Sequence, residues 1–291
     1  MRILFAAALL ALLAPHASAW WCNGHMYTAA IAYRNLTQSA KDKADSLVAY
    51  FAKEYSNSPD FIQAACWADD VKEERLNLMS DWHFTNNPVV KDVVTGQVPA
   101  SANDKNVVWA LNGINETLQY RGPEAHAFSK AFAMRLLIHF AGDIHQPLHT
   151  VTMFSDAQFP PPVGDQGGNL FKIAGANQSE LHAFWDSGCG LWEVDRDRPL
   201  NTSAYDQVYA LVDDIVRDYP PSFFGDRLNT SDSFADWATD SYSIGVNNVY
   251  TLTPGSALSS QYVATSREIA RQQVALGGYR LASFLNDVFG S

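Results

Sequence analysis

The segment of residues 137–149 constrains this chain most, because it carries three histidines and an aspartate within an apolar run. His139 and Asp143 are four residues apart, about 40° around a helix, so their side chains lie on one face. Pro147 ends that helix, and His149 therefore approaches from a turn. A single histidine is usually hydrogen-bonded in a core or at a surface, but this grouping favours a functional site.

Four shorter motifs supply further side chains of the same kinds. His182 and Asp186 repeat the four-residue spacing, although such a pair alone is more often a surface ion pair. Asp69 and His83 each stand beside aromatic residues, a context that usually indicates core packing. The remaining motif ends in His25. Each motif is weak alone, and their combination carries the prediction.

Residues 1–19 have the pattern of a secretory signal peptide. Arg2 supplies a positive charge, residues 3–14 are an unbroken apolar run, and Ala-Ser-Ala at 17–19 is a cleavage pattern. The run is too short to span a membrane. We therefore expect a secreted protein, located outside the cell or in the lumen of the secretory pathway, with a single catalytic domain over residues 20–291.

Cleavage after residue 19 would make Trp20 the first residue, with a free α-amino group that can bind a metal beside its own carbonyl. His25, five residues on, could complete a site there. With the other motifs this gives five imidazoles, three carboxylates and one amine. Zinc prefers about four N, O or S ligands, so one ion cannot use them all, whereas three ions can if a carboxylate bridges.

The charge balance excludes one mode of nucleic-acid binding. The 291 residues include 20 Lys and Arg against 31 Asp and Glu, a formal net charge of −11. A basic stripe along the protein is therefore not expected. Three Zn²⁺ ions could instead provide a cationic focus that binds phosphate esters and activates water near neutral pH.

Helical periodicity dominates the rest of the chain, over residues 125–142, 204–219, 234–250 and 262–289. Alternating strand patterns are scarce, with at best short pieces near residues 169–173. We expect an all-α fold class: a single mostly helical domain with long loops and at most a short β-hairpin. No later segment has the pattern of a membrane span. We also expect a monomer, although no motif bears on the oligomeric state.

Two further features suit a secreted protein. Cys22, Cys66 and Cys189 allow at most one internal disulfide, and the sequence leaves its pairing open. Glycosylation is expected at surface sequons, which begin at Asn35, Asn115, Asn177, Asn201 and Asn229.

The residues alone thus indicate a secreted, multi-zinc, helical phosphoester hydrolase. The ordered motifs also resemble those of the zinc-dependent, single-strand-specific class I nucleases and 3′-nucleotidases, in the superfamily of zinc phospholipase C. The matching elements are Trp20…Gly24-His25, Trp67-Ala68-Asp69, Trp82-His83-Phe84, His139-Phe140-Ala141-Gly142-Asp143, Gln146-Pro147-Leu148-His149, Gly167-Gly168-Asn169 and Leu181-His182-Ala183-Phe184-Trp185-Asp186.

This resemblance implies three Zn²⁺ ions. The ligands implied for the first ion are Asp69, His83, His139 and Asp143. Those for the second are His149, His182 and Asp186. Those for the third are the amine and carbonyl of Trp20, His25 and the bridging Asp143.

The resemblance also implies a mechanism. The first and third ions would lie about 3.5–4 Å apart, and a hydroxide between them, held by Asp69, would attack phosphorus in line. The second ion would stabilise the leaving 3′-oxygen. Single-stranded DNA and RNA would be cut endonucleolytically to 5′-phosphate products, and 3′-mononucleotides would lose their 3′-phosphate. Lys72 stands where the family commonly has an arginine that neutralises charge; lysine keeps the charge but loses the bidentate fork.

Two positions concern substrate binding. Phe84 matches the family's base-stacking aromatic, and stacking tolerates any unpaired base. At Asn86 fungal members carry an acid that hydrogen-bonds the base, so the base preference of this chain is open. The stretch between His149 and His182 is also longer than in the shortest members, which affects substrate access.

Three alternatives to the nuclease assignment exist. A pure 3′-nucleotidase or broader phosphomonoesterase stays open, because the same site would serve both reactions, and the other two have specific sequence consequences. A phospholipase C-like phosphoesterase would share the three zincs, but that branch has glutamate where this chain has Asp186. A non-catalytic secreted zinc-binding protein would lack a ligand, and here every motif position is filled. His126 and His145 are left over, and hydrogen bonding explains both better than metal binding.

Overall fold

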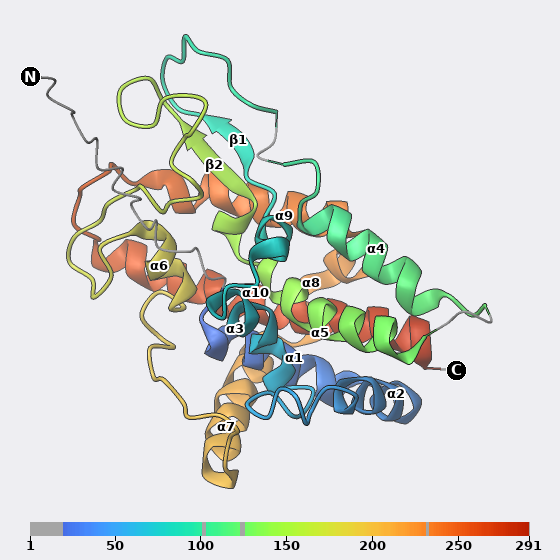
Figure 1. Cartoon of the computed structure of the whole chain (residues 1–291). Helices are drawn as coiled ribbons and strands as arrows, with labels where there is room; N and C mark the ends of the chain where they lie inside the picture. The colour runs from blue at the N-terminus through green and yellow to red at the C-terminus, as the bar shows by residue number, and fades with distance from the viewer. Residues whose placement is uncertain (1–19, 101–102, 123–125, 231–232, 291) are drawn as a thin grey trace, which may run out of the picture.

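Helices account for most of the chain, and α5 and α10 run through its middle (Figure 1). The computed structural model describes residues 20–290 except 101–102, 123–125 and 231–232. The signal peptide expected at residues 1–19 lies outside the described residues. The α-helices are α1 (Cys22–Asn35), α2 (Gln38–Ala49), α3 (Trp67–Glu73), α4 (Val107–Gln119), α5 (Ala127–Asp143), α6 (Leu181–Asp186), α7 (Thr202–Asp218), α8 (Pro221–Phe224), α9 (Phe234–Asn247) and α10 (Ser260–Phe289).

Short 3₁₀ turns join several of these helices: η1 (Gln63–Cys66), η2 (Asn77–His83), η3 (Pro147–His149), η4 (Gly225–Thr230) and η5 (Val249–Thr251). The four long helical segments predicted from periodicity correspond to α5, α7, α9 and α10. The prediction of a mostly helical fold is therefore confirmed. None of the described helices is both long and apolar enough to cross a membrane.

The carboxyl-terminal two-thirds of α5 is buried, as its nearly continuous apolar sequence requires. The helix ends at Asp143, and Gln146 then begins η3 by accepting a hydrogen bond from the backbone N–H of Leu148 at 2.6 Å. The amino-terminal helix α1 crosses α10 closely, because a Cβ added at Gly278 would lie 2.6 Å from the Cβ of Ile31. These contacts fix α1, α5 and η3, which carry candidate ligands.

The sheet consists of β1 (Asn87–Val90) and β2 (Val151–Phe154), which pair in parallel, with Asn87 opposite Val151. The strand content is as small as predicted, but the two strands are parallel rather than a hairpin, because α4 and α5 lie between them in sequence. Near residues 169–173 the structure has isolated bridges, such as Lys172 with Glu180, rather than a strand. Strand pairing was hard to foresee because it depends on contacts between distant segments.

A disulfide joins Cys22 to Cys66 across 44 residues, and Cys189 is a buried free cysteine. The disulfide ties the start of α1 to the junction of η1 and α3. The pairing left open by the sequence is thereby resolved.

The buried apolar side chains form two clusters. One contains Ile138 and Phe140 of α5, and the other contains Leu181 and Trp185 of α6. The candidate ligands His139 of α5 and His182 and Asp186 of α6 are next to these residues in sequence and are themselves buried. An apolar surround of this kind excludes water and strengthens electrostatic interactions.

Candidate metal centre

The two helical His–Asp pairs have nearly the same local geometry. His139 Nε2 lies 3.2 Å from Asp143 Oδ2 on α5, and His182 Nε2 lies 3.2 Å from Asp186 Oδ2 on α6. All four side chains are buried. Each separation follows from the four-residue spacing along a helix. The sequence therefore predicts these two pairs without knowledge of any tertiary contact.

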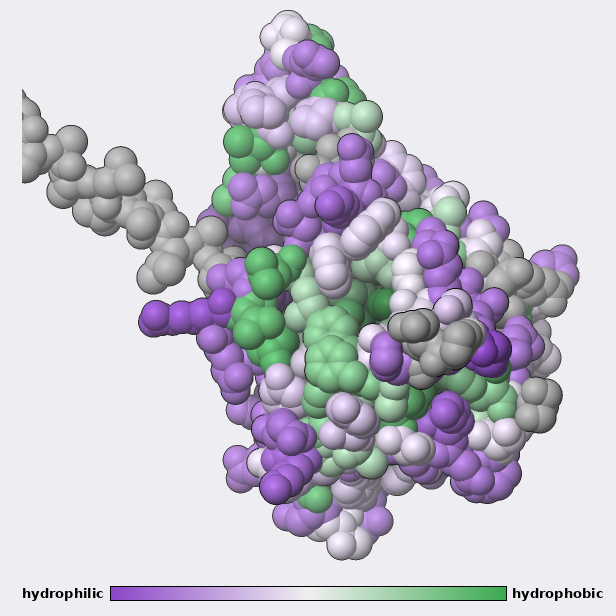
Figure 2. All heavy atoms as spheres, turned by 45° about the vertical axis from the view of Figure 1, so that its right-hand side comes forward, coloured by the Kyte–Doolittle hydropathy of each residue, from purple (hydrophilic) through white to green (hydrophobic). Residues whose placement is uncertain are grey.

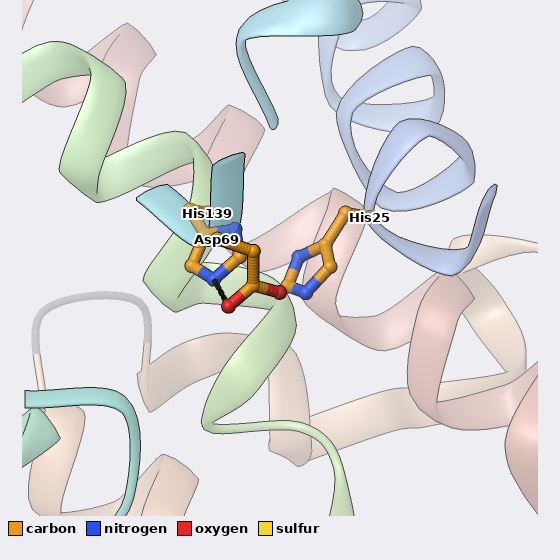
Figure 3. Close-up of side chains that lie close together, drawn as sticks. All are labelled: His25, Asp69 and His139. Atoms are coloured by element: carbon orange, nitrogen blue, oxygen red, sulfur yellow. Dashed lines mark ion pairs between the residues drawn. The ribbon is translucent and has the colours of Figure 1, made fainter. Parts of the chain in front are cut away.

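Three other elements bring further side chains to the α5 pair. Asp69 of α3 places Oδ1 3.8 Å from His139 Nε2 and 3.7 Å from His83 Nε2 at the end of η2. His25 of α1 places Nε2 3.7 Å from Asp143 Oδ1. Figure 3 shows the carboxylate of Asp69 pointing between the rings of His25 and His139. Residues far apart in sequence thus converge on one point.

Backbone carbonyls orient most of these imidazoles. In each case Nδ1 lies 2.6–2.9 Å from a carbonyl oxygen, so that Nδ1–H donates and Nε2 points into the site. The pairs are His83 with Met79, His139 with Ala65, His149 with His83, and His182 with Gly167. A ring held in this tautomer presents a lone pair of the kind that binds a metal ion.

His25 is held by packing instead. Neither of its ring nitrogens forms a hydrogen bond to any described residue, although the side chain is fully buried. Its ring stacks on that of His139 with centroids 4.0 Å apart. A buried imidazole with no partner costs free energy unless a ligand satisfies it.

A second group adjoins the first. His149 places Nδ1 3.4 Å from Asp143 Oδ1, and its ring stacks on that of His182 with centroids 5.2 Å apart. Asp186 accepts a hydrogen bond at Oδ1 from the Gln146 side chain at 2.6 Å. This bond turns Oδ2 of Asp186 toward His182, so the second group presents two imidazoles and one carboxylate.

The electrostatics of the site reflect crowding of these charges. Burial opposes the protonation of His139, but Asp143 and Asp69 together raise its pKa to about 9. Burial raises the pKa of Asp143 to about 6. Burial, with the nearby Lys72 and His139, lowers the pKa of His83 to about 3. Strongly shifted pKa values in one buried cluster are typical of functional sites.

The donor set fits a divalent metal. Three sets of ligand atoms lie within 4.8 Å of one another: His25, Asp69 and His139; His83, His139 and Asp143; His149, His182 and Asp186. Nε2 of His83, His139 and His149 and both carboxylate oxygens of Asp143 form no hydrogen bond to the described residues. Imidazole nitrogens and carboxylate oxygens of this kind suit zinc.

Trp20 is the first described residue and lies just before α1, which carries His25. Its side chain is fully buried against Trp192, with ring centroids 5.4 Å apart. The next residue, Trp21, donates its backbone N–H to the carbonyl of Asp186 at 2.9 Å. A Cβ on Gly24 would lie 2.8 Å from the Cβ of Trp20, so the chain before α1 folds back closely on that helix.

The expected catalytic and substrate residues also lie near the cluster. The ammonium of Lys72 lies 2.8 Å from Asp69 Oδ1. Lys72 as a whole residue is only 6% exposed. Phe84 is partly exposed and directly follows His83. Asn86 has φ +49, and its side-chain oxygen would lie 3.3 Å from a Cβ at Gly167.

The two histidines left unassigned lie elsewhere. His145 is buried, with Nδ1 2.7 Å from the carbonyl of Ala141 and Nε2 3.1 Å from the guanidinium of Arg280. His126 is exposed at the start of α5. Neither belongs to the three sets that could hold a metal.

Two further residues, for which the sequence predicted no role, support the candidate ligands. Gln146 holds Asp186, and Gly142 leaves room for His25, because a Cβ there would lie 2.4 Å from His25 Nδ1. Gly142 stands between His139 and Asp143, and a glycine inside a ligand-bearing helix is a sequence signal of close approach.

A mostly helical protein with a buried cluster of imidazoles and carboxylates is a candidate polynuclear metalloenzyme. The family profile described as S1/P1 Nuclease matches residues 20–290, and the chain belongs to this family. The expected resemblance is confirmed, and membership defines the chain as a nuclease, a hydrolase that acts on nucleic acids.

Individual relatives are distant but align along most of their length. Endonuclease 2 of Arabidopsis thaliana is 25% identical over 301 residues, covering 95% of this chain and 93% of that protein. Endonuclease 4 of the same plant is 25% identical over 245 residues, covering 80% and 78%. Nuclease P1 of Penicillium citrinum is 23% identical over 296 residues, covering 94% and 98%.

Proposed function

We propose that this nuclease is a secreted tri-zinc phosphodiesterase. It cuts single-stranded DNA and RNA internally to 5′-phosphate products and removes the 3′-phosphate from 3′-mononucleotides. The observation that carries the proposal is the convergence of buried imidazoles and carboxylates, several of which make no hydrogen bond to the described residues. Such groups are costly in an apolar surround unless metal ions bind them.

The proposed ligand sets are those that the family resemblance implies, and the second of them coincides with the group of His149, His182 and Asp186. The first ion would be held by Asp69, His83, His139 and Asp143, the second by His149, His182 and Asp186, and the third by Trp20, His25 and Asp143. Asp143 suits a bridging role, because Oδ2 faces His139 at 3.2 Å while Oδ1 faces His25 at 3.7 Å. Two oxygens of one carboxylate thus face ligands of two different ions.

Zinc, when bound, would polarise the phosphoryl group and lower the pKa of water. The protein's own residues would orient the reactants. Asp69 would hold the attacking water at the site, and Lys72, 2.8 Å from Asp69, would place a positive charge beside the phosphate. Lys72 is a single ammonium, so it would neutralise charge without the two parallel hydrogen bonds of an arginine.

Substrate selection would depend on Phe84 and Asn86. A partly exposed aromatic ring directly after a metal ligand can stack on a base only if that base is unpaired. The amide of Asn86 offers both a donor and an acceptor to the base edge. This arrangement supports a preference for single strands over duplexes.

The proposed secretion and glycosylation rest on the sequence. Asn35, Asn177 and Asn201 are exposed, and Asn115 is partly exposed, as attachment of a glycan requires. The fifth sequon, at Asn229, includes Ser231, which lies outside the described residues.

The proposal is tested by metal content together with activity. The secreted protein should contain three zinc ions per chain and cleave single-stranded DNA. Chelation should abolish cleavage, and added zinc should restore it. Duplex DNA should be cut far more slowly, and a lecithin should not be hydrolysed. Cleavage that survives complete removal of metal would refute the proposal, and turnover of lecithin in preference to DNA would favour the phospholipase C-like alternative.

A further inference from the structure

Two tryptophans form a ring pair beside the candidate metal centre. Trp82 of η2 and Trp109 of α4 have ring centroids 5.5 Å apart at an interplanar angle of 56°. Trp109 is 46% exposed, whereas Trp82 is partly buried and packs on the hydrophobic cluster around α5. Packing on this cluster explains why position 82 carries a tryptophan. It does not explain why the ring of Trp109 is so exposed to solvent.

The pair is linked directly to the residues of the proposed site. Trp82 immediately precedes His83, and Phe84 immediately follows it. The backbone N–H of Val107, at the start of α4, donates to the carbonyl of Phe84 at 3.3 Å. This bond sets the first turn of α4, which carries Trp109, against the segment that carries His83 and Phe84.

A positively charged side chain, Lys105, lies beside the tryptophan pair. The ammonium of Lys105 lies 5.7 Å from the centroid of the Trp109 ring, and Lys105 is exposed. On a chain with net charge −11, a lysine at an exposed aromatic pair offers local attraction for a phosphate backbone. Exposed aromatic rings with a nearby cation are the features by which proteins hold unpaired nucleotides.

The wider surface agrees with a binding role. Figure 2 brings the side of α4 and α5 forward and shows hydrophobic residues gathered across the middle of this face, among hydrophilic ones. Besides Trp109, the exposed apolar residues of the chain include Leu76 and Leu78, which adjoin or belong to η2. Apolar side chains gathered on one face in this way often mark an interaction site.

We propose that Trp82 and Trp109 form a second stacking platform, which holds an unpaired base of the same strand next to the nucleotide at Phe84. The inference rests on the proposed nuclease function and adds a subsite to it. Trp109 is the contacting residue, Trp82 supports its ring from below, and Lys105 faces the backbone phosphate. A 3′-mononucleotide has a single base and cannot occupy both Phe84 and the platform, so the platform should matter only for longer strands.

The test compares Trp109→Ala with the wild type on two substrates, a 3′-mononucleotide and a single-stranded decamer. Alanine is the best helix former, so α4 should persist. The KM for the decamer should rise about 5- to 150-fold, from the loss of one stacked base, while kcat/KM for the 3′-mononucleotide stays unchanged. Trp109→Phe should restore most of the decamer binding. Tyr120→Ala is the matched control, because Tyr120 is a similarly exposed aromatic at the other end of α4.

A second measurement is independent of cleavage. Binding of a fluorescent decathymidylate to metal-free wild type and Trp109→Ala should differ by a similar factor. Equal binding, or equal loss of activity on both substrates, would overturn the platform. If the wild type bound the decamer through Trp109 yet cleaved nothing with zinc restored, the platform would stand and the proposed catalytic function would fail.

Discussion

Gly142 on α5 and His25 on α1 approach so closely that no side chain fits between them, since a Cβ at position 142 would lie 2.4 Å from His25 Nδ1. The contact stacks the His25 ring on His139 and directs its Nε2 toward Asp143. The position of one candidate ligand therefore depends on the absence of a methyl group on a neighbouring helix.

Gly142→Ala should displace His25 and weaken the third metal site. We expect loss of about one zinc per chain, a fall in nuclease activity of at least tenfold, and a destabilisation of about 1–3 kcal/mol from overpacking. Metal analysis and thermal unfolding would measure these effects. Gly113→Ala on α4 is the control, because nothing lies within 4 Å of its added Cβ; it should stabilise the helix by about 0.5–1 kcal/mol. Full metal content in Gly142→Ala would contradict the role of His25.

Gln146→Leu should weaken the second metal set while leaving the fold intact. The change removes the hydrogen bond to Asp186 and the acceptor for the backbone N–H of Leu148. Loss of a residue that orients a metal ligand typically reduces metal affinity about 10- to 100-fold. A zinc titration against a competing chelator would show one ion released earlier. Gln119→Leu, at an exposed position, should titrate like the wild type, and identical curves for both variants would remove Gln146 from this role.

Asp143→Asn tests the proposed bridge. The amide keeps the size of the side chain but has one oxygen instead of two, so activity should fall by several orders of magnitude with one or two zincs lost. Phe84→Ala should behave differently, with weaker binding of polynucleotide and unchanged metal content. Retention of three zincs and near-normal turnover in Asp143→Asn would show that the carboxylate does not bridge.

The proposed amino terminus can be tested by adding one residue before Trp20 and leaving the rest of the sequence unchanged. If Trp20 binds zinc through its free amine, one residue added before it converts that amine to an amide and removes a ligand. Protein made in the cytosol with an added methionine should fold but lack one zinc and most activity, whereas secreted protein should begin at Trp20 and be fully active. Amino-terminal sequencing, metal analysis and a nuclease assay would decide this, and a fully active extended protein would exclude the Trp20 ligand.

Local helix and turn geometry explains which contacts of the candidate site could be predicted from the sequence. The pairs His139–Asp143 and His182–Asp186 are separated by one helical turn, and both reach 3.2 Å because that spacing alone brings side chains together. The turn that carries His149 was foreseeable from Pro147, which cannot continue a helix. The positions of the long helices could be inferred from such short-range patterns, whereas the nuclease family was indicated by the resemblance of the ordered motifs.

Long-range packing decided the rest. The pairing of Cys22 with Cys66, the parallel register of β1 and β2, and the approach of Asp69 to His83 and His139 each join segments distant in sequence. No local spacing encodes these contacts, because they depend on how α1, α3 and η2 pack against α5. The carbonyls that orient the imidazoles, and the room that Gly142 leaves for His25, exist only once those helices have packed.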